Sequence, residues 1–419
     1  MKKKTIEKGD SFMKKNQFVF GWVLFVIAIA FASYVNGISH KLGLFTVTGL
    51  GIGYVMQRSR FGFAGIVRKM YIMGNGDLPR AVLFLLSISL IVVAAVQYNA
   101  SIHDLKIPGM SSVKVISMLT VIGAFIFGIG MMFAGGCASG TLTDIGEGYV
   151  RAIVALIFFC IGSVIGVAHL DTLKQTVLAH GVKVYLPDYI GYFASISVFL
   201  VFYGIMYLFV RKYEAKRKAE GTFVEETYEE WEKPMKVEDE TKFNAFDFST
   251  YHTFFVKRWS FYTGGVMLTV MFLVVLMTTG KNWGVSTTFT YWGAWILQWF
   301  GVDVSGIGFF QTEKAIKIMQ GGFIHDAGSV RNLGIMIGTV IASLLAGGLE
   351  ITKHVGLKQN MAYIIGGLFM GYGARLGSGC NIGAFYSALS SMSLSGIVFG
   401  FFLILGGIVG LKLVDKFKL

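Results

Sequence analysis

The segments FGIGMMFAGGCASGTL, residues 127–142, and MGYGARLGSGCNIGAF, residues 370–385, align without a gap at an offset of 243 residues (370 minus 127). Both contain the pattern G-x-G-x5-G-C-x2-G, with its cysteine at Cys137 in the first copy and Cys380 in the second. Agreement at so many positions indicates an internal duplication. We therefore predict a protein with two related halves.

Each copy of the motif predicts a helix that is broken at its cysteine. An apolar stretch ends in small residues, including Gly136 and Gly379, and a shorter apolar stretch follows the cysteine. At membrane depth, backbone groups released from the helical ladder must be satisfied by protein or by a polar cavity. We therefore expect broken, re-entrant half-helices that meet at a central pathway.

The residues around the two breaks favour an anion. A helix that starts at each cysteine directs its amides at the break, and this end carries roughly half an elementary positive charge. Thiols are soft, polarisable groups that suit a sulfur atom better than a hard cation. The candidate pathway residues are Cys137, Cys380, Gly136, Gly379, Ser139, Ser378, Asn381 and Arg375. The alternative is that these small residues only permit tight packing between membrane helices.

Several charged residues lie near the motifs. Arg375 precedes Cys380 by five residues and is expected either to attract the anion or to pair with a backbone carbonyl. Glu147 is expected to pair with Arg151 at helical i, i+4 spacing. Arg58 and Arg60, in QRSRFGFAG, indicate either a positive-inside anchor or a basic mouth that attracts anions.

Composition places the chain in a lipid bilayer. Of 419 residues, 54% are hydrophobic and 15% charged, and the mean hydropathy is +0.64. These values predict an all-α polytopic membrane protein. Shorter apolar pieces at 42–56 and 283–300 could be tilted spans or re-entrant segments. The full-length spans are expected at 18–36, 81–98, 115–134, 150–169, 189–210, 259–279, 333–350, 361–376 and 394–413.

Charge divides the chain into four parts. We predict a basic tail at 1–17, a first transmembrane half at 18–210, a charged linker at 211–258 and a second transmembrane half at 259–419. The net charge of +13 is spread over the tail, the linker and the C-terminus instead of forming one patch, which argues against a nucleic-acid partner. By the positive-inside rule, both termini and the linker are expected in the cytoplasm, with the protein in a bacterial inner membrane. Parallel and inverted arrangements of the halves both remain open.

Cysteine and histidine usage predicts neither a metal site nor a cofactor. The cysteines are Cys137, Cys160 and Cys380, all in apolar segments without a CxxC pair, and the seven histidines are scattered singly. Cys160 has no counterpart in the repeat and is expected to be a packing residue.

Taken with GIGYVMQRSRFGFAG and NWGVSTTFTYWGAWILQWFG, the two cysteine motifs resemble the YeeE/YedE family of sulfur-transport membrane proteins. This resemblance covers most of the chain apart from the tail and the linker. It implies a permease for thiosulfate or a related sulfur species, or for a selenium species as in a YedE-like branch associated with selenium metabolism. It also implies that Cys137 and Cys380 contact the substrate in succession.

The resemblance is incomplete at one position. The family usually has a third cysteine in the segment that matches residues 60–63, where this chain has Gly62. A relay of three thiols therefore cannot operate here, and the mouth is expected to be wider or filled by Phe61 and Phe63. Two other functions remain as alternatives to a non-enzymatic permease. One is a membrane thiol enzyme that passes sulfur or electrons, and the other a scaffold that binds a soluble sulfur-carrier protein through the linker around Trp231.

Overall fold

The computed structural model describes residues 2–228, 232–233, 248–352 and 356–418, with side chains described in these ranges except at 2–15 and 248–249. Part of the predicted linker, including Trp231, lies outside these ranges. Most of the described residues are helical, which confirms the prediction of an all-α polytopic membrane protein. The described residues also form a short antiparallel pair of strands, β1 (Val115–Ser117) and β2 (Gly181–Lys183), that the sequence patterns did not predict.

The first half of the chain contains eight α-helices among its described residues. They are α1 (Lys2–Ile38), α2 (His40–Ser59), α3 (Gly65–Arg68), α4 (Asp77–Ile102), α5 (Met118–Phe133), α6 (Ala138–Gly146), α7 (Val150–Leu173) and α8 (Pro187–Ala219). Short π or 3-10 turns are η1 (Lys69–Met73), η2 (Met110–Ser112) and η3 (Val177–Ala179).

The second half follows the linker. Its α-helices are α9 (Phe248–Tyr251), α10 (Phe261–Thr279), α11 (Ser286–Trp299), α12 (Glu313–Gly321), α13 (Ala327–Leu345), α14 (Leu357–Leu376), α15 (Ser387–Ser390) and α16 (Leu394–Phe417). Short π or 3-10 turns are η5 (His252–Val256), η6 (Gly308–Gln311), η7 (Phe323–His325) and η8 (Asn381–Tyr386).

Eight segments of the described chain are long and apolar enough to cross a membrane, which makes this a multi-pass membrane protein. Helix α14, expected as a span at 361–376, forms but is not among them. The expected span at 333–350 is wrong in its bounds. Helix α13 starts at Ala327 because the Asp326 carboxylate accepts hydrogen bonds from the amides of Gly328 and Ser329, and it ends at Leu345.

The two copies of the cysteine motif pack against each other with twofold symmetry. A Cβ placed on Gly130 of α5 would lie 2.6 Å from the amide nitrogen of Met370, and one on Gly373 of α14 would lie 2.6 Å from that of Phe127. Gly130 and Gly373 are equivalent in the repeat, and so are Phe127 and Met370. Each glycine therefore permits the same close backbone approach in its own copy.

The symmetry inverts one copy relative to the other. A Cβ placed on Gly123, near the start of α5, would lie 2.2 Å from the amide nitrogen of Gly377, just past the end of α14. Positions earlier in α5 therefore contact positions later in α14. Equivalent helices thus run antiparallel, the arrangement of inverted repeats in many transporters. The neighbouring contacts agree, because α7 packs on α14 as α16 packs on α5, and α13 packs on α6 as α4 packs on α15.

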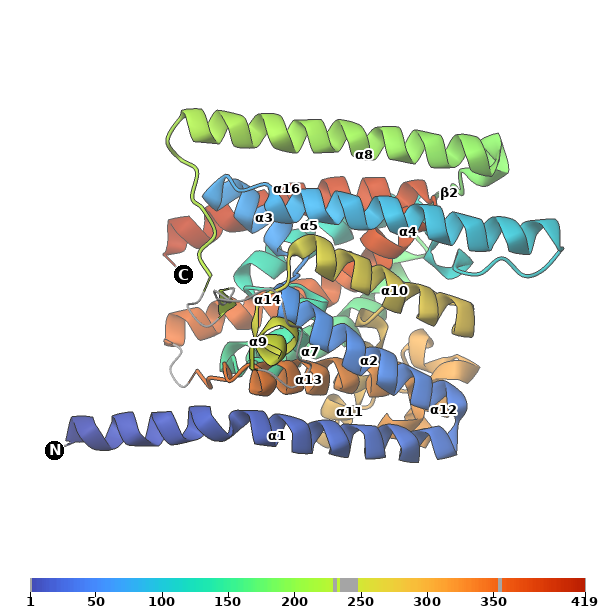
Figure 1. Ribbon diagram of the computed structural model, residues 1–419. Helices are drawn as coiled ribbons and strands as arrows, with labels where there is room; N and C mark the ends of the chain where they lie inside the picture. The colour runs from blue at the N-terminus through green and yellow to red at the C-terminus, as the bar shows by residue number, and fades with distance from the viewer. Residues whose placement is uncertain (1, 229–231, 234–247, 353–355, 419) are drawn as a thin grey trace.

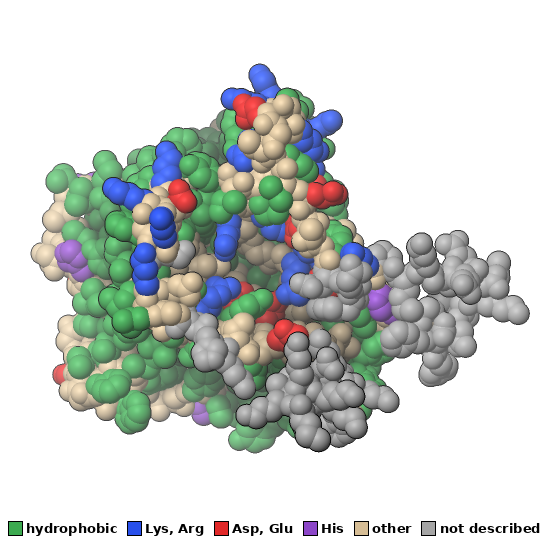
Figure 2. All heavy atoms as spheres, turned by 90° about the vertical axis from the view of Figure 1, so that its left-hand side faces the viewer, with side chains coloured by type: hydrophobic (Ala, Val, Ile, Leu, Met, Phe, Trp, Pro, Cys, Tyr) green, Lys and Arg blue, Asp and Glu red, His purple; other side chains and the backbone are tan. Residues whose placement is uncertain are grey.

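One end of the helical bundle gathers the polar segments of the chain. Both termini, the end of α8 and helices α3 and α9 lie at this end, on the left of Figure 1. Viewed from there, Lys and Arg side chains gather over the face, with Asp and Glu side chains among them (Figure 2). We call this face the basic end.

Candidate functional site

The first break separates α5 from α6. The chain turns through Ala134–Gly136, where Gly135 has a φ of 76°, and Cys137 takes the N-cap position of α6. The Cys137 carbonyl accepts hydrogen bonds from the Thr141 amide at 2.7 Å and the Thr141 hydroxyl at 2.9 Å, while its thiol lies 3.5 Å from the Ser139 hydroxyl. The predicted interruption at Cys137 is therefore present, and it lies inside the candidate span Met118–Gly146.

The second break has the same design. Helix α14 ends at Leu376, Ser378 adopts a left-handed φ of 61°, and Cys380 takes the N-cap position of η8, which continues into α15. The Asn381 side chain donates to the Met131 sulfur of α5 at 3.8 Å, and its amide oxygen has no partner among the described residues. This contact ties the second break to the helix that precedes the first.

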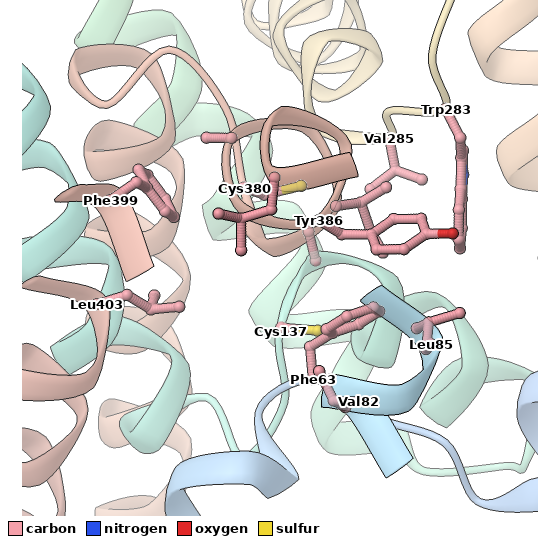
Figure 3. Packing of buried hydrophobic residues seen from close by; sticks show 14 of the residues in the cluster. Phe63, Val82, Leu85, Cys137, Trp283, Val285, Cys380, Tyr386, Phe399 and Leu403 are labelled. Carbon is pink, nitrogen blue, oxygen red and sulfur yellow. The ribbon is translucent and has the colours of Figure 1, made fainter. Parts of the chain in front are cut away.

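Both cysteines belong to one buried cluster of side chains. Cys137 and Cys380 are 1% and 0% exposed, and the same cluster contains Phe63 and Tyr386, whose ring centroids lie 6.0 Å apart. In the view of Figure 3, Cys137 lies beside the Phe63 ring, with Cys380 and Tyr386 above them. The structure therefore brings the repeated thiols into one region of the core, with aromatic side chains beside them.

A cleft of about 170 Å³ reaches Cys137. Its wall includes Gly62, where a Cβ would meet nothing within 4 Å, so this position is open space. Phe61 and Phe63 are buried and do not fill it. The complete lining consists of Met56, Arg60, Phe61, Gly62, Ala64, Gly65, Lys69, Leu78, Gly135, Gly136, Cys137, Gly140, Thr143, Asp144 and Glu147.

The charged residues of the cleft are held in ion pairs. Arg60 pairs with Glu147 at 2.7 Å, and Arg151 pairs with Asp144 at 2.9 Å. The expected pair of Glu147 with Arg151 is therefore wrong. Helix α6 ends at Gly146 and α7 begins at Val150, so no continuous helix places these two side chains on one face.

The predicted basic residues Arg58 and Arg60 lie in different environments. Arg60, just beyond the end of α2, lines the cleft. Arg58 is 1% exposed and donates hydrogen bonds to the Val256 carbonyl and, at 3.3 Å, to the Gln57 side chain. Lys69, at the start of η1, is the second cation on the cleft wall.

The remaining predicted residues lie around the second break. Arg375 is buried near the end of α14 and donates to the Ser286 hydroxyl at 3.0 Å, while its Nε atom has no partner among the described residues. Ser378 is exposed, two residues before the fully buried Cys380. Ser139 is buried beside Cys137. Within the described ranges, no group of three or more His, Cys, Asp or Glu side chains is arranged to hold a metal ion.

Comparisons with known proteins agree with this architecture. Residues 58–409 match a family model described as sulphur transport. A thiosulfate transporter of Escherichia coli is 26% identical over 369 residues, covering 86% of this chain and 91% of that protein. A thiosulfate transporter of Spirochaeta thermophila is 24% identical over the same length, covering 86% of this chain and 96% of that protein.

A third relative matches over a shorter stretch. A probable transporter named YedE, also from Escherichia coli, is 30% identical over 143 residues, which is 34% of this chain and 35% of that protein. The family match, by contrast, includes both cysteine breaks and every residue of the cleft lining except Met56. On the extent of that match, the chain belongs to the sulphur transport family, the YeeE/YedE family that its motifs resemble.

Proposed function

We propose that this protein is a permease for a small sulfur-containing anion, such as thiosulfate or a related sulfur or selenium species. The observation that carries this proposal is the position of Cys137. Its thiol lies at a helix N-terminus on the wall of a cleft, and its repeat counterpart Cys380 occupies the same position at the second break. The names of the two longer relatives support thiosulfate as a first substrate to test.

The contacts in the proposed pathway are individually weak. The amides of the first turn of α6 lack acceptors within the helix, so they offer donors and a positive dipole to an anion beside Cys137. The thiol and the Ser139 hydroxyl add a soft donor and a neutral donor. Conduction requires release as well as capture, so several weak hydrogen bonds serve better than a covalent bond.

The two breaks act in succession in this proposal. Arg60 and Lys69 attract the anion to the cleft, Cys137 receives it, and Cys380, Asn381 and Arg375 serve the second break. Phe63 and Tyr386 belong to the same buried cluster as the two cysteines, so in this proposal their rings move to let substrate pass. By the positive-inside rule the basic end faces the cytoplasm of a bacterial inner membrane, with the termini and linker on that side.

Uptake of radiolabelled thiosulfate by the purified protein in liposomes tests the proposal. The unaltered protein is expected to accumulate label, and Cys137→Ala and Cys380→Ala are each expected to lose most of that activity. Cys160→Ala is the matched control, because Cys160 is equally buried but lies in the middle of α7 and in neither break. Unchanged uptake in both Cys137→Ala and Cys380→Ala would contradict the proposed role of the thiols.

The same preparation separates the permease from the two other functions. A thiol enzyme would change the number of free thiols during turnover, whereas a permease leaves Cys137 and Cys380 reduced throughout. A scaffold would show no uptake in liposomes, because the purified preparation contains no soluble sulfur-carrier protein. Uptake with a constant thiol count therefore supports the permease alone.

A further inference from the structure

The chain that follows α8 runs across the basic end beside the cleft. Residues 221–228 are not helical, and hydrogen bonds from Arg217 at the end of α8 and from Val224 hold the chain along η1. The Arg217 guanidinium donates to the carbonyls of Tyr71 and Ile72, both at 3.0 Å, and the Val224 amide donates to the Met73 carbonyl at 2.8 Å. This segment is therefore anchored next to Lys69, the first residue of η1.

Two carboxylates of the linker pair with the cations of the cleft. Glu226 forms an ion pair with Lys69 at 2.6 Å and a second one with Arg258. Glu232 pairs with Arg60 at 3.0 Å, and its side chain is only 4% exposed. Lys69 and Arg60 are the two basic residues that line the cleft, so linker carboxylates engage both of them.

The placement of these carboxylates is specific. The neighbouring Glu225 is exposed, whereas Glu226 and Glu232 are turned toward the protein. Arg258 reinforces the arrangement. Its guanidinium lies over the rings of Tyr228 and Phe261, 4.5 Å and 5.2 Å from their centroids. The backbone amide of Arg258 donates to the Glu232 carbonyl at 3.1 Å. Cation–π contacts of this kind stabilise a guanidinium in a fixed position.

A bound carboxylate and an incoming anion compete for the same positive charge. Glu226 and Glu232 reduce the positive potential at the cleft, which is the property that would concentrate an anionic substrate there. The pairs are partly buried, so salt screens them less than it screens exposed pairs. The linker thus places an acidic group on each of the two cations of the cleft wall, in addition to the Glu147 carboxylate that pairs with Arg60.

We propose that Glu226 and Glu232 form an autoinhibitory acidic lid, which must leave Lys69 and Arg60 before an anion enters the cleft. The identity of the anion rests on the proposed function, but the lid itself rests only on these ion pairs. Anything that draws the linker away from the basic end, such as a cationic partner surface, opens the cleft.

Two measurements test the lid. The variant Glu226→Gln/Glu232→Gln keeps side-chain size and one acceptor oxygen per residue while removing both charges, and Glu225→Gln is the matched control. In liposomes at low ionic strength, the double variant is expected to take up dilute thiosulfate about fivefold faster than the control, because the mouth regains its positive potential. Added salt should reduce this difference.

The second measurement does not depend on the substrate. In a Cys160→Ala/Cys380→Ala background only Cys137 can react, and its modification by a sulfonate-bearing methanethiosulfonate reagent reports access of an anion to the cleft. The double variant is expected to react about tenfold faster than the Glu225→Gln control. Equal rates in the two would overturn the lid, whatever the uptake assay shows. Faster labelling without thiosulfate uptake by any form would support the lid and contradict the proposed function.

Discussion

The two cysteine breaks share a backbone but differ in the chemistry that surrounds them. In the first copy the cysteine is followed by Asp144, Glu147 and Arg151, whereas Ser387, Ser390 and Leu394 occupy these positions in the second. Cys137 opens on a cleft with ion pairs on its wall, and Cys380 is enclosed. The segment that follows the cysteine is therefore charged in the first copy and uncharged at the equivalent positions of the second.

This difference distinguishes the residues that the helix interruption needs from the side chains that line the opening of the cleft. The break needs only small residues, because glycines allow the close approach of α5 and α14 and the left-handed turn before each cysteine. The side chains beyond it are free to diverge. In an inverted repeat the two divergent segments face opposite sides of the membrane. Charged residues in one segment alone therefore make the two sides of the protein chemically different.

The largest effect is expected from giving the first break one residue of the second. Arg151→Leu leaves Asp144 without its ion-pair partner, and both side chains are about four-fifths buried. An uncompensated, partly buried carboxylate is expected to lower the free energy of unfolding by about 2–3 kcal/mol. The melting temperature of the detergent-solubilised protein measures this loss.

The double variant Asp144→Ser/Arg151→Leu is the matched control. It converts both positions to the residues found at Ser387 and Leu394 and leaves no unpaired charge. We expect it to recover most of the stability lost in Arg151→Leu. Equal losses in the single and double variants would show that the ion pair is not what distinguishes the two breaks.

A pH dependence is expected to belong to the first break. Burial raises the pKa of Glu147 to about 7 from an ordinary value of 4.5, although Arg60 favours the charged form. The folded protein then binds a proton that the unfolded chain releases, so this contribution to stability is complete below pH 4.5 and is lost as the pH rises through about 7.

The variant Glu147→Gln removes this titration. Between about pH 5 and about pH 8, the unaltered protein is expected to lose on the order of 1–2 kcal/mol relative to the variant, after allowance for solvent screening. The melting temperatures of both proteins at the two pH values provide the measurement. Ser390→Ala, at the equivalent position of the second break, is expected to leave the pH dependence unchanged.

A smaller effect is expected from exchanging the turn residues. Gly135 and Ser378 are equivalent and both left-handed, with φ of 76° and 61°. Gly135→Ser puts a Cβ 2.5 Å from the Arg151 Nη1 atom and is expected to cost about 1 kcal/mol. Ser378→Gly relieves backbone strain at some cost in chain entropy, so its stability should rise slightly or stay the same. A loss in Ser378→Gly would mean that the serine side chain stabilises the second break.

The sequence was sufficient to predict the features that depend on local composition. Apolar length predicted the membrane helices, and the duplicated glycine and cysteine pattern predicted both interruptions, because each follows from residues close together in the chain. The start of α13 was missed because Arg331 and Asn332 are polar yet buried. Their side chains donate to the carbonyls of Gly284 and Val285, residues that no local pattern connects with them.

Features that depend on distant residues could not be predicted. The partner of Glu147 is Arg60, 87 residues away, and the partner of Lys69 is Glu226, 157 residues away. The inversion of the repeat could not be predicted either, because the sequence does not show which short apolar pieces cross the membrane. In the structure, the close contacts between α5 and α14 reveal that equivalent helices run antiparallel.

The smallest effect is expected at Gly62, on the wall of the cleft, where the family resemblance leads us to expect a third cysteine. A Cβ there meets nothing within 4 Å, so Gly62→Cys should change the free energy of unfolding by less than about 0.5 kcal/mol. Gly53→Cys is a contrasting control, because its Cβ would lie 2.0 Å from the Ile335 carbonyl oxygen and should disrupt the packing of α2 on α13. In a background without the native cysteines, the new thiol should react with a small anionic reagent from the basic end. A stable Gly62→Cys protein with an unreactive thiol would show that this wall of the cleft is not the route by which anions reach Cys137.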